Sequence, residues 1–479
     1  MMPVVLWTDA LLWLLVAAAA GYALYARRHP HLRAPWRRVT RSVAGMVSAV
    51  VLAFFVTVGL LDSLHYRPAL ERKDAEGRTV YAVEVRSVLD ALVEPLRVRT
   101  EKTYSAPFAT HAYSKETVDL ADGKISREFP RLRHGGAHLA SEDDRARDIA
   151  RRTAQGLAAA IVAWGLCAFV LVWRLSRGRG ASIAATWRAV WRGETEVPWG
   201  AMLVTGGCIF ALAFPAGVLS AGYHVLGTDK VGQNVLYLSL KSIRTALVIG
   251  GLTTLVMLPF AVLLGIAAGY FKGWVDDVIQ YVYTTLNSIP AVLLIAAAVL
   301  MMQVYIDSHP ELFPTAAQRA DLRLLFLAII LGLTSWTGLA RLLRGETLKL
   351  RELEYIQAAR AFGVGDGRII TRHILPNVMH LVMIALVMDF SGLVLAEAVL
   401  SYVGVGVDPT MTSFGTMINS ARLELAREPM VWWALAAAFA FMFVLVLAAN
   451  LFADAVRDAF DPRTRVGAAV PVSSGRKPA

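Results

Sequence analysis

The chain has 479 residues, of which 56% are hydrophobic and 18% charged, and its formal net charge is +11. Soluble domains carry roughly 45–50% apolar and about 25% charged residues, so this composition excludes a soluble globular protein, a disordered chain and a disulfide scaffold. The apolar residues form long runs, which indicates an integral membrane protein. The positive charges lie in short segments between these runs, where they orient spans and do not indicate nucleic acid as a partner.

A helix that crosses a bilayer needs about 20 mainly apolar residues. The sequence predicts nine such spans, at 4–25, 42–62, 154–173, 200–222, 240–269, 277–303, 322–341, 377–400 and 431–453. The first run is interpreted as a retained span, because its basic cluster follows the apolar residues, unlike the arrangement in a signal peptide. The fold class expected is therefore an all-α polytopic membrane protein.

Arginine-rich segments follow the first, third and seventh predicted spans, and they share one side if the spans alternate. Because cytoplasmic loops are enriched in Lys and Arg, that side is predicted to be the cytoplasm. The N-terminus is then expected outside and the C-terminus inside, in a bacterial inner membrane. The basic segment 174–192, which also carries Trp187 and Trp191, is interpreted either as a surface that lies on anionic lipid or as a plain basic linker.

Residues 63–153 are predicted to lie outside the cell despite their many basic residues, because segments longer than about 60 residues translocate largely regardless of charge. They are expected to form a small α/β ectodomain. Strand-like composition occurs at 79–85 and 117–120, with a hairpin turn at Asp122-Gly123, and 87–96 favours a short helix.

The connection 342–376 is helical in composition and falls on the predicted cytoplasmic side. A helix starting at Glu354 is expected to end at Gly363, because glycine suits the left-handed position after a helix. Asp366 is predicted to be the N-cap of a second short helix. Two short helices at an angle would form a compact knob below the membrane.

The order Gln357-Ala358-Ala359, Gly363 and Leu375-Pro376 resembles the Glu-Ala-Ala, Gly and Leu-Pro signature of binding-protein-dependent ABC importer permeases. The ending His373-Ile374-Leu375-Pro376-Asn377 is similar to the dipeptide/oligopeptide branch of that family. Three further stretches resemble the same branch, at 224–236, 401–417 and 457–463. The chain departs from the pattern where Gln357 replaces the usual Glu and where Gln233-Asn234 replaces an Arg-Asp pair.

The resemblance covers roughly the last 280 residues and implies a six-helix permease core at 200–462 that contains the coupling loop 342–376. Three extra spans and the ectodomain precede this core. The expected domains are 1–62 with two helices, the ectodomain 63–153, a third helix and basic linker at 154–199, the core, and a flexible cytoplasmic tail at 463–479. The role of residues 1–198 does not follow from the resemblance.

The resemblance further implies a permease subunit of an ATP-driven importer of peptides or peptide-like solutes. Its expected partners are a second permease subunit, two cytoplasmic ABC ATPases, an extracytoplasmic solute-binding protein and membrane lipid. The sequence contains no Gly-x-x-x-x-Gly-Lys-[Ser/Thr] phosphate loop, so ATP and Mg²⁺ are expected on the ATPases, and the chain is predicted to be no enzyme and to bind no metal or cofactor. The residues implied to couple to the ATPases are Glu354, Gln357, Ala358, Ala359, Phe362, Gly363, Leu375 and Pro376.

Two polar residues inside predicted spans, Asp389 and Asn287, are candidates for the substrate path, because polar groups in a membrane usually face a bundle interior or cavity. The alternative for both is a structural hydrogen bond between helices. A different function also stays open, a membrane-anchored sensor or assembly factor that acts through the ectodomain. The coupling loop distinguishes the two hypotheses, since a sensor has no need of it.

Overall fold

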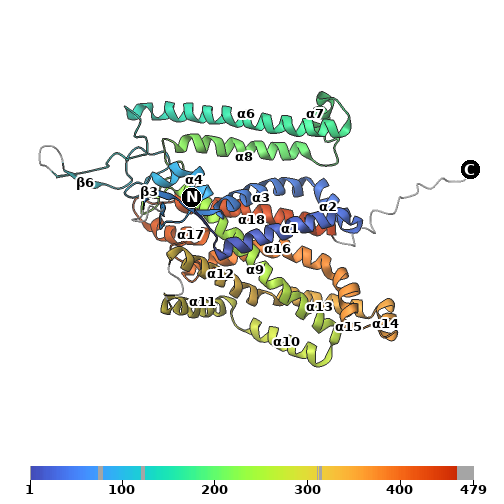
Figure 1. Cartoon of the computed structure of the whole chain (residues 1–479). Helices are drawn as coiled ribbons and strands as arrows, with labels where there is room; N and C mark the ends of the chain where they lie inside the picture. Colours follow the sequence, from blue (N-terminus) through green and yellow to red (C-terminus); the bar gives the residue numbers. More distant parts are fainter. Residues whose placement is uncertain (1, 74–78, 120–124, 310, 312–314, 461–479) are drawn as a thin grey trace, which may run out of the picture.

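The structure is a computed structural model that describes residues 2–73, 79–119, 125–309, 311 and 315–460. Among these residues nine helical segments are long and apolar enough to cross a membrane, which confirms the predicted number of spans. They run side by side in Figure 1, with the short strands at one end of the bundle and the small helix α14 (Glu354–Ala361) at the other. The chain is an all-α polytopic membrane protein with a small α/β ectodomain.

The spanning helices are α1 (Trp7–Arg28), α3 (Val43–Asp62), α6 (Arg145–Arg179), α8 (Trp199–Ser220), α9 (Val235–Phe271), α11 (Ala291–Ser308), α12 (Ala316–Ser335) with its continuation α13 (Thr337–Arg351), α16 (Leu375–Val403) and α18 (Trp433–Phe460). Shorter helices connect them: α2 (Pro30–Arg41), α7 (Ile183–Trp191), α10 (Gly273–Ser288), α14, α15 (Asp366–Ile369) and α17 (Phe414–Arg422).

The prediction of one continuous helix over 277–303 was wrong. Two helices occupy this stretch, because α10 ends at Ser288 and α11 begins at Ala291. Between them Pro290 has no backbone N–H to donate, and it keeps the preceding Ile289 in an extended conformation at φ −91° and ψ 132°.

Helix α9 lies at the centre of the bundle and packs against α1, α3, α12, α13 and α16 (Figure 1). Two glycines one helical turn apart, Gly265 and Gly269, allow α13 to approach closely. A Cβ atom on either glycine would lie 2.7 Å from a backbone oxygen of α13. Small residues four apart are the usual means by which membrane helices reach such close packing, so the contact between α9 and α13 depends on their lack of a side chain.

The residues before the predicted core pack directly on it. Helix α1 lies against α9 and α12, and α3 contacts α18, α9 and α8. Helices α6 and α8 form a separate pair along one edge of the bundle in Figure 1. At their contact Gly156 approaches the backbone of Pro215, and Trp164 Nε1 donates a hydrogen bond of 2.7 Å to the carbonyl of Leu203.

The ectodomain contains short antiparallel strands and two short helices. The first sheet has the order β1–β2–β5, with β1 (Met2–Val4), β2 (His65–Arg67) and β5 (Arg86–Ser87). The first residues of the chain, which precede α1, therefore belong to the ectodomain. The other pairs are β3 (Ala69–Lys73) with β4 (Thr79–Tyr81), and β6 (Glu116–Asp119) with β7 (Ile125–Glu128).

The strand predicted at 79–85 is shortened to β4, whereas the one predicted at 117–120 corresponds to β6 at 116–119. The predicted turn Asp122-Gly123 lies outside the described residues. The single helix expected at 87–96 is divided into α4 (Val88–Leu92) and α5 (Glu94–Val98). Ser87 starts α4 with a reciprocal capping box to Asp90. Pro95 in the first turn of α5 suits a new helix start, because its missing N–H would have no helical partner there.

Candidate functional site

The predicted coupling helix forms as expected. Helix α14 begins at Glu354 and ends at Ala361, and Gly363 adopts the left-handed conformation with φ +76°. The N–H of Val364 closes this turn on the carbonyl of Ala359 at 3.1 Å. A residue with a side chain would be strained at this φ, so glycine fixes where the helix stops.

One side chain of α14, Ile356, is fully buried and belongs to a cluster with Ile369, Ile374 and Leu343. The opposite face is open, and the ring of Phe362 is 87% exposed. An exposed aromatic residue beside a buried anchor presents an apolar contact surface on a fixed base. The local geometry therefore makes α14 a rigidly held knob with an exposed apolar side chain at its end.

The end of α9 holds this knob through Tyr270. The Tyr270 hydroxyl donates a hydrogen bond of 2.6 Å to Asp366 of α15, and its ring lies under the guanidinium of Arg360 of α14, 5.9 Å away. Arg351 at the end of α13 donates to the Tyr270 carbonyl at 2.7 Å. The ends of α9, α13, α14 and α15 therefore meet around one residue.

The expectation that Asp366 caps the second helix was wrong. Gly365 occupies the cap position, and Asp366 is the first residue of α15 with its carboxylate directed to Tyr270. A partner from α9, more than 90 residues earlier in the chain, competes with the local backbone for this carboxylate, and sequence proximity does not reveal it.

A single π-type turn, Ile370–Ile374, joins α15 to α16 and precedes Pro376 in the first turn of α16. Proline has no N–H for a helical hydrogen bond, and π-type turns occur mostly as single wider turns within α-helices, as here. The side chain of Asn377 donates to the carbonyl of His373 at 2.6 Å and so reinforces this turn. The Leu-Pro-Asn sequence thus sets the junction between the knob and a spanning helix.

The structure brings the predicted coupling residues together on one knob. Two of them are half-buried and six are exposed. Ala359 and Leu375 are half-buried against the core cluster. The others are exposed: Glu354, Gln357, Ala358, Phe362, Gly363 and Pro376. Gln357 donates from its amide to the carbonyl of Glu352 at 3.2 Å, which ties α14 to the end of α13. Their role in coupling stays a prediction.

The two substrate-path candidates lie apart. Asn287, near the end of α10, accepts a hydrogen bond of 3.2 Å from Thr337 of α13, as the structural alternative predicted. Asp389 is half-buried in α16, and within the described ranges it has no hydrogen-bond or ion-pair partner. A carboxylate without a partner in a membrane helix is costly unless water or another molecule reaches it.

A cluster of buried charges, which the sequence interpretation missed, joins the extra N-terminal residues to α9. Arg244 of α9 contacts Asp9 of α1 at 2.6 Å and Asp321 of α12 at 3.6 Å. His65 reaches the other oxygen of Asp9 at 2.7 Å. One turn before, Lys241 contacts Asp62 of α3 at 2.5 Å and Asp90 of α4 at 3.2 Å. We call these residues the charge cluster.

Burial of a charge in a membrane protein is expensive, and a partner of opposite charge must offset the cost. In the charge cluster α9 supplies the lysine and the arginine. Three of the four carboxylates that pair with them come from α1, α3 and α4, and the fourth comes from α12. A signal for it is present in the sequence, because Asp9, Lys241 and Arg244 are ionisable residues within or beside apolar runs. Which of them pair is decided only by the fold.

Glu101 of the ectodomain forms a second attachment, between the ectodomain and the stretch that precedes α9. Its carboxylate accepts hydrogen bonds from the backbone N–H groups of Arg133, His134 and Gly135 at 2.8 to 3.1 Å, and it lies 3.1 Å from Nε2 of His224. Burial by itself would raise the pKa of Glu101, but these hydrogen bonds lower it to about 2. Glu101 thus connects the ectodomain to the 224–236 stretch that precedes α9.

Backbone contacts extend this attachment. The N–H of Glu101 donates to the carbonyl of Gly232 at 2.9 Å, and the N–H of Thr228 donates to Ser105 at 3.0 Å. Gly232 has φ +76°, and a Cβ atom there would lie 1.9 Å from the Glu101 carbonyl oxygen. Only glycine fits this close approach, so the ectodomain and the 224–236 stretch form one continuous structure.

Comparison with known proteins identifies the second half of the chain. The family model described as binding-protein-dependent transport system inner membrane component matches residues 261–466. The oligopeptide transport system permease protein OppC of Mycobacterium bovis is 31% identical over 242 residues, which are 50% of this chain and 77% of that protein. The glutathione transport system permease protein GsiD of Pectobacterium atrosepticum is 33% identical over 50% of this chain and 73% of its own length.

The dipeptide transport system permease protein DppC of Lactococcus lactis subsp. cremoris is 30% identical over 247 residues, or 52% of this chain and 66% of that protein. About half of the chain is covered in each of these matches.

Across the described part of the chain, no group of three or more His, Cys, Asp or Glu residues is arranged to hold a metal ion.

Replacement of Asp9 by Asn is expected to destabilise the protein, because Arg244 would keep only the more distant Asp321 as a charged partner. Breaking a buried ion pair from one side costs about 3–5 kcal/mol, so thermal unfolding of the purified full chain in detergent should begin at a clearly lower temperature. The matched control is Asp144→Asn at an exposed ion pair, where the expected loss is below about 1 kcal/mol. Equal unfolding temperatures for Asp9→Asn and the control would contradict the role of the charge cluster.

The Glu101 attachment predicts a pH dependence. Because the pKa of Glu101 is lowered from 4.5 to about 2, its charge stabilises the folded state above pH 4.5, and this contribution is lost as pH falls towards 2. Glu101→Gln should therefore unfold at a lower temperature than the unmodified chain at pH 6, and the gap should close towards pH 2. A gap that stayed constant over this range would show that the Glu101 charge does not stabilise the attachment of the ectodomain to the 224–236 stretch.

Proposed function

Since this chain belongs to the family of binding-protein-dependent transport system inner membrane components, we propose that it carries peptides or peptide-like solutes across the inner membrane as the permease subunit of an ATP-driven importer. The multi-pass helical bundle agrees with a translocation subunit. The solute class is inferred from the relatives, whose names refer to oligopeptides, dipeptides and glutathione.

The observation that carries the proposal is the construction of α14. The apolar side chain of Phe362, directly after the helix, is open to a partner, while Ile356 of the helix is fixed in the core cluster. Such a surface suits a cleft on a cytoplasmic ATPase. The coupling residues proposed are the eight predicted from the sequence. Phe362, Ala358, Gln357 and Glu354 would lie at the contact, and Ala359, Gly363, Leu375 and Pro376 would give the knob its shape.

Movement of the knob can reach the spanning helices directly. Tyr270 links α14 and α15 to the end of α9, and the closely packed pair Gly265 and Gly269 links α9 to α13. Arg344 of α13 holds Asp276 of α10 through two hydrogen bonds of 2.6 and 2.7 Å. A push or pull on α14 would therefore shift α9, α10, α13 and α16 together, and a partner that binds one arrangement more tightly biases the equilibrium between two states.

The energy for this shift would come from elsewhere. The sequence has no phosphate loop, so ATP and Mg²⁺ are assigned to two partner ATPases and not to this chain. A second permease subunit would complete the pathway, and an extracytoplasmic binding protein would deliver the solute. The knob is then cytoplasmic, which puts the N-terminus and the ectodomain outside, since they lie at the end of the bundle opposite α14 (Figure 1).

The domain boundaries form part of the proposal. Residues 200–462 would be the transport core, and 1–62, 63–153 and 154–199 an addition that the curated relatives need not share, with 463–479 as a cytoplasmic tail. The alternative of a membrane-anchored sensor or assembly factor would explain the ectodomain. The family membership and the anchored α14 favour transport, because a sensor has no use for a docking knob.

Phe362→Glu is expected to reduce solute uptake at least about tenfold in proteoliposomes that hold the chain with its partner subunits, because a charge would be forced into an apolar contact. The ring is largely exposed, so unfolding temperature and membrane insertion should not change. The matched control is Phe129→Glu, an exposed phenylalanine of the ectodomain. Normal uptake and normal ATPase stimulation in Phe362→Glu would remove the coupling role.

Asp389→Asn tests the substrate path. The half-buried carboxylate would attract the amino group of a peptide, so its loss should raise the KM for uptake several-fold while ATP hydrolysis without solute stays the same. Asn287→Ala is the comparison, because Asn287 already bonds to Thr337 and should affect stability more than KM. An unchanged KM in Asp389→Asn would exclude Asp389 from the path.

A further inference from the structure

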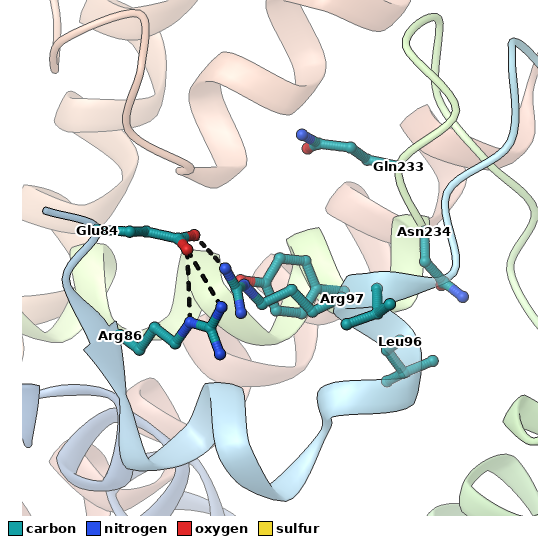
Figure 2. Close-up of a pocket in the computed structure, with 8 residues that line it drawn as sticks. Glu84, Arg86, Leu96, Arg97, Gln233 and Asn234 are labelled. Atoms are coloured by element: carbon teal, nitrogen blue, oxygen red, sulfur yellow. Dashed lines mark hydrogen bonds and ion pairs between the residues drawn. The ribbon is translucent and has the colours of Figure 1, made fainter. Parts of the chain in front are cut away.

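A cavity of about 400 Å³ lies in the seam between the ectodomain and the start of α9 (Figure 2). One wall comes from Glu84 and Arg86 before α4, and a second from Arg97 and its neighbours in α5. The third wall is formed by Gln233 and the residues that lead into α9. Pockets for small molecules typically measure roughly 300–1,000 Å³, so this one has room for an amino acid or a short peptide.

Two arginines in this cavity share one carboxylate. Arg86 donates to Glu84 Oε2 from Nε at 3.4 Å and from Nη2 at 3.3 Å, and Arg97 donates to the other oxygen of Glu84. Figure 2 shows both guanidinium groups turned towards Glu84. Arginine binds carboxylates with a rigid fork of N–H donors. The charged residues of the lining are therefore two arginines and one glutamate, which leaves a net charge of one positive unit.

The two sides of this contact differ in how firmly they are held. The side chain of Arg97 is 19% exposed, and α5 is anchored by the buried Leu96. The Glu84 side chain is 55% exposed and lies outside any helix or strand, between β4 and β5. A carboxylate from solution could therefore replace Glu84 at Arg97, while Glu84 returns to water. The exchange of one carboxylate for another at the same guanidinium costs little electrostatic energy.

The rest of the lining suits the remainder of an amino-acid or peptide molecule. Leu96 and Val98 supply apolar surface for an aliphatic side chain. The amide of Gln233 extends over the open part of the cavity in Figure 2, where it can donate to or accept from a peptide group. The hydroxyl of Tyr237 is engaged by Asp90 at 2.8 Å, so it forms a fixed part of the wall.

We infer that this cavity binds the carboxylate end of an amino acid or short peptide, with Arg97 and Arg86 as receptors for the carboxylate and Glu84 as a built-in competitor. The site lies in the ectodomain seam and not among the coupling residues, so it does not rest on the proposed transport function. A bound molecule would contact both α5 and the 224–236 stretch, and it would stabilise the attachment of the ectodomain to the bundle.

The inference can be tested by isothermal titration of the purified full chain in detergent at constant ionic strength. Three probes are compared: alanylalanine, alanylalanine with an amidated C-terminus, and inorganic phosphate. Alanylalanine should bind and raise the unfolding temperature, whereas the amide and phosphate should do neither. Arg97→Ala should weaken binding of alanylalanine at least about tenfold. Arg147→Ala, at an arginine 87% exposed elsewhere in the chain, should leave binding unchanged.

Glu84→Gln separates a binding role from a merely structural one. Removal of the competing carboxylate should strengthen alanylalanine binding about threefold or more, an effect that a destabilising substitution would not produce. Weaker or unchanged binding in Glu84→Gln would overturn the inference, as would equal binding of the amidated dipeptide. Phosphate binding that depends on Arg97 would instead indicate a general anion site and also overturn it. If Arg97→Ala does not fold, Arg86→Ala supplies the same comparison.

Discussion

The buried Arg244 and the half-buried Lys241 of α9 impose the constraint on which the N-terminal half of the molecule depends. Arg244 and Lys241 lie one turn apart on the central helix, and each needs a carboxylate within contact distance. Asp9, Asp62 and Asp90 provide these carboxylates from three separate segments of the extension. The extension is therefore part of the electrostatic structure of the bundle. It is not a tethered addition.

The same helix leads to the opposite end of the molecule, where Tyr270 gathers the ends of α13, α14 and α15. One element therefore connects the charge cluster with the proposed docking knob. Glycines at positions 265 and 269 make this connection stiff, because they bring the backbones of α9 and α13 into direct contact. The inferred amino-acid or peptide cavity lies beside the first turn of α9, so in the proposed transporter a ligand there would contact the helix that leads to the knob.

Glu101 shows how closely the ectodomain and the permease core have become one structure. Its carboxylate is held by three backbone N–H groups and by His224, and its own backbone passes over Gly232. The stretch 224–236 lies between the two parts and contacts both of them, because Thr228 bonds Ser105 of the ectodomain through its N–H and accepts a hydrogen bond of 2.9 Å from Trp433 of α18 through its carbonyl. The attachment uses backbone groups, which every sequence has, so it leaves little trace in residue patterns.

Sequence by itself determined the number of spans and the left-handed turn at Gly363 after α14, because hydrophobic length and the left-handed freedom of glycine are local properties. It also determined the family, through motifs with fixed spacing. Tertiary structure alone decided that Asp366 bonds Tyr270 and does not cap its own helix, that Asn287 serves a helix contact, and that Arg244 pairs with Asp9. In each of these cases several polar groups of similar chemistry could serve as the partner. The actual partner is the group that folding brings within bonding distance, and spacing in the sequence does not encode that distance.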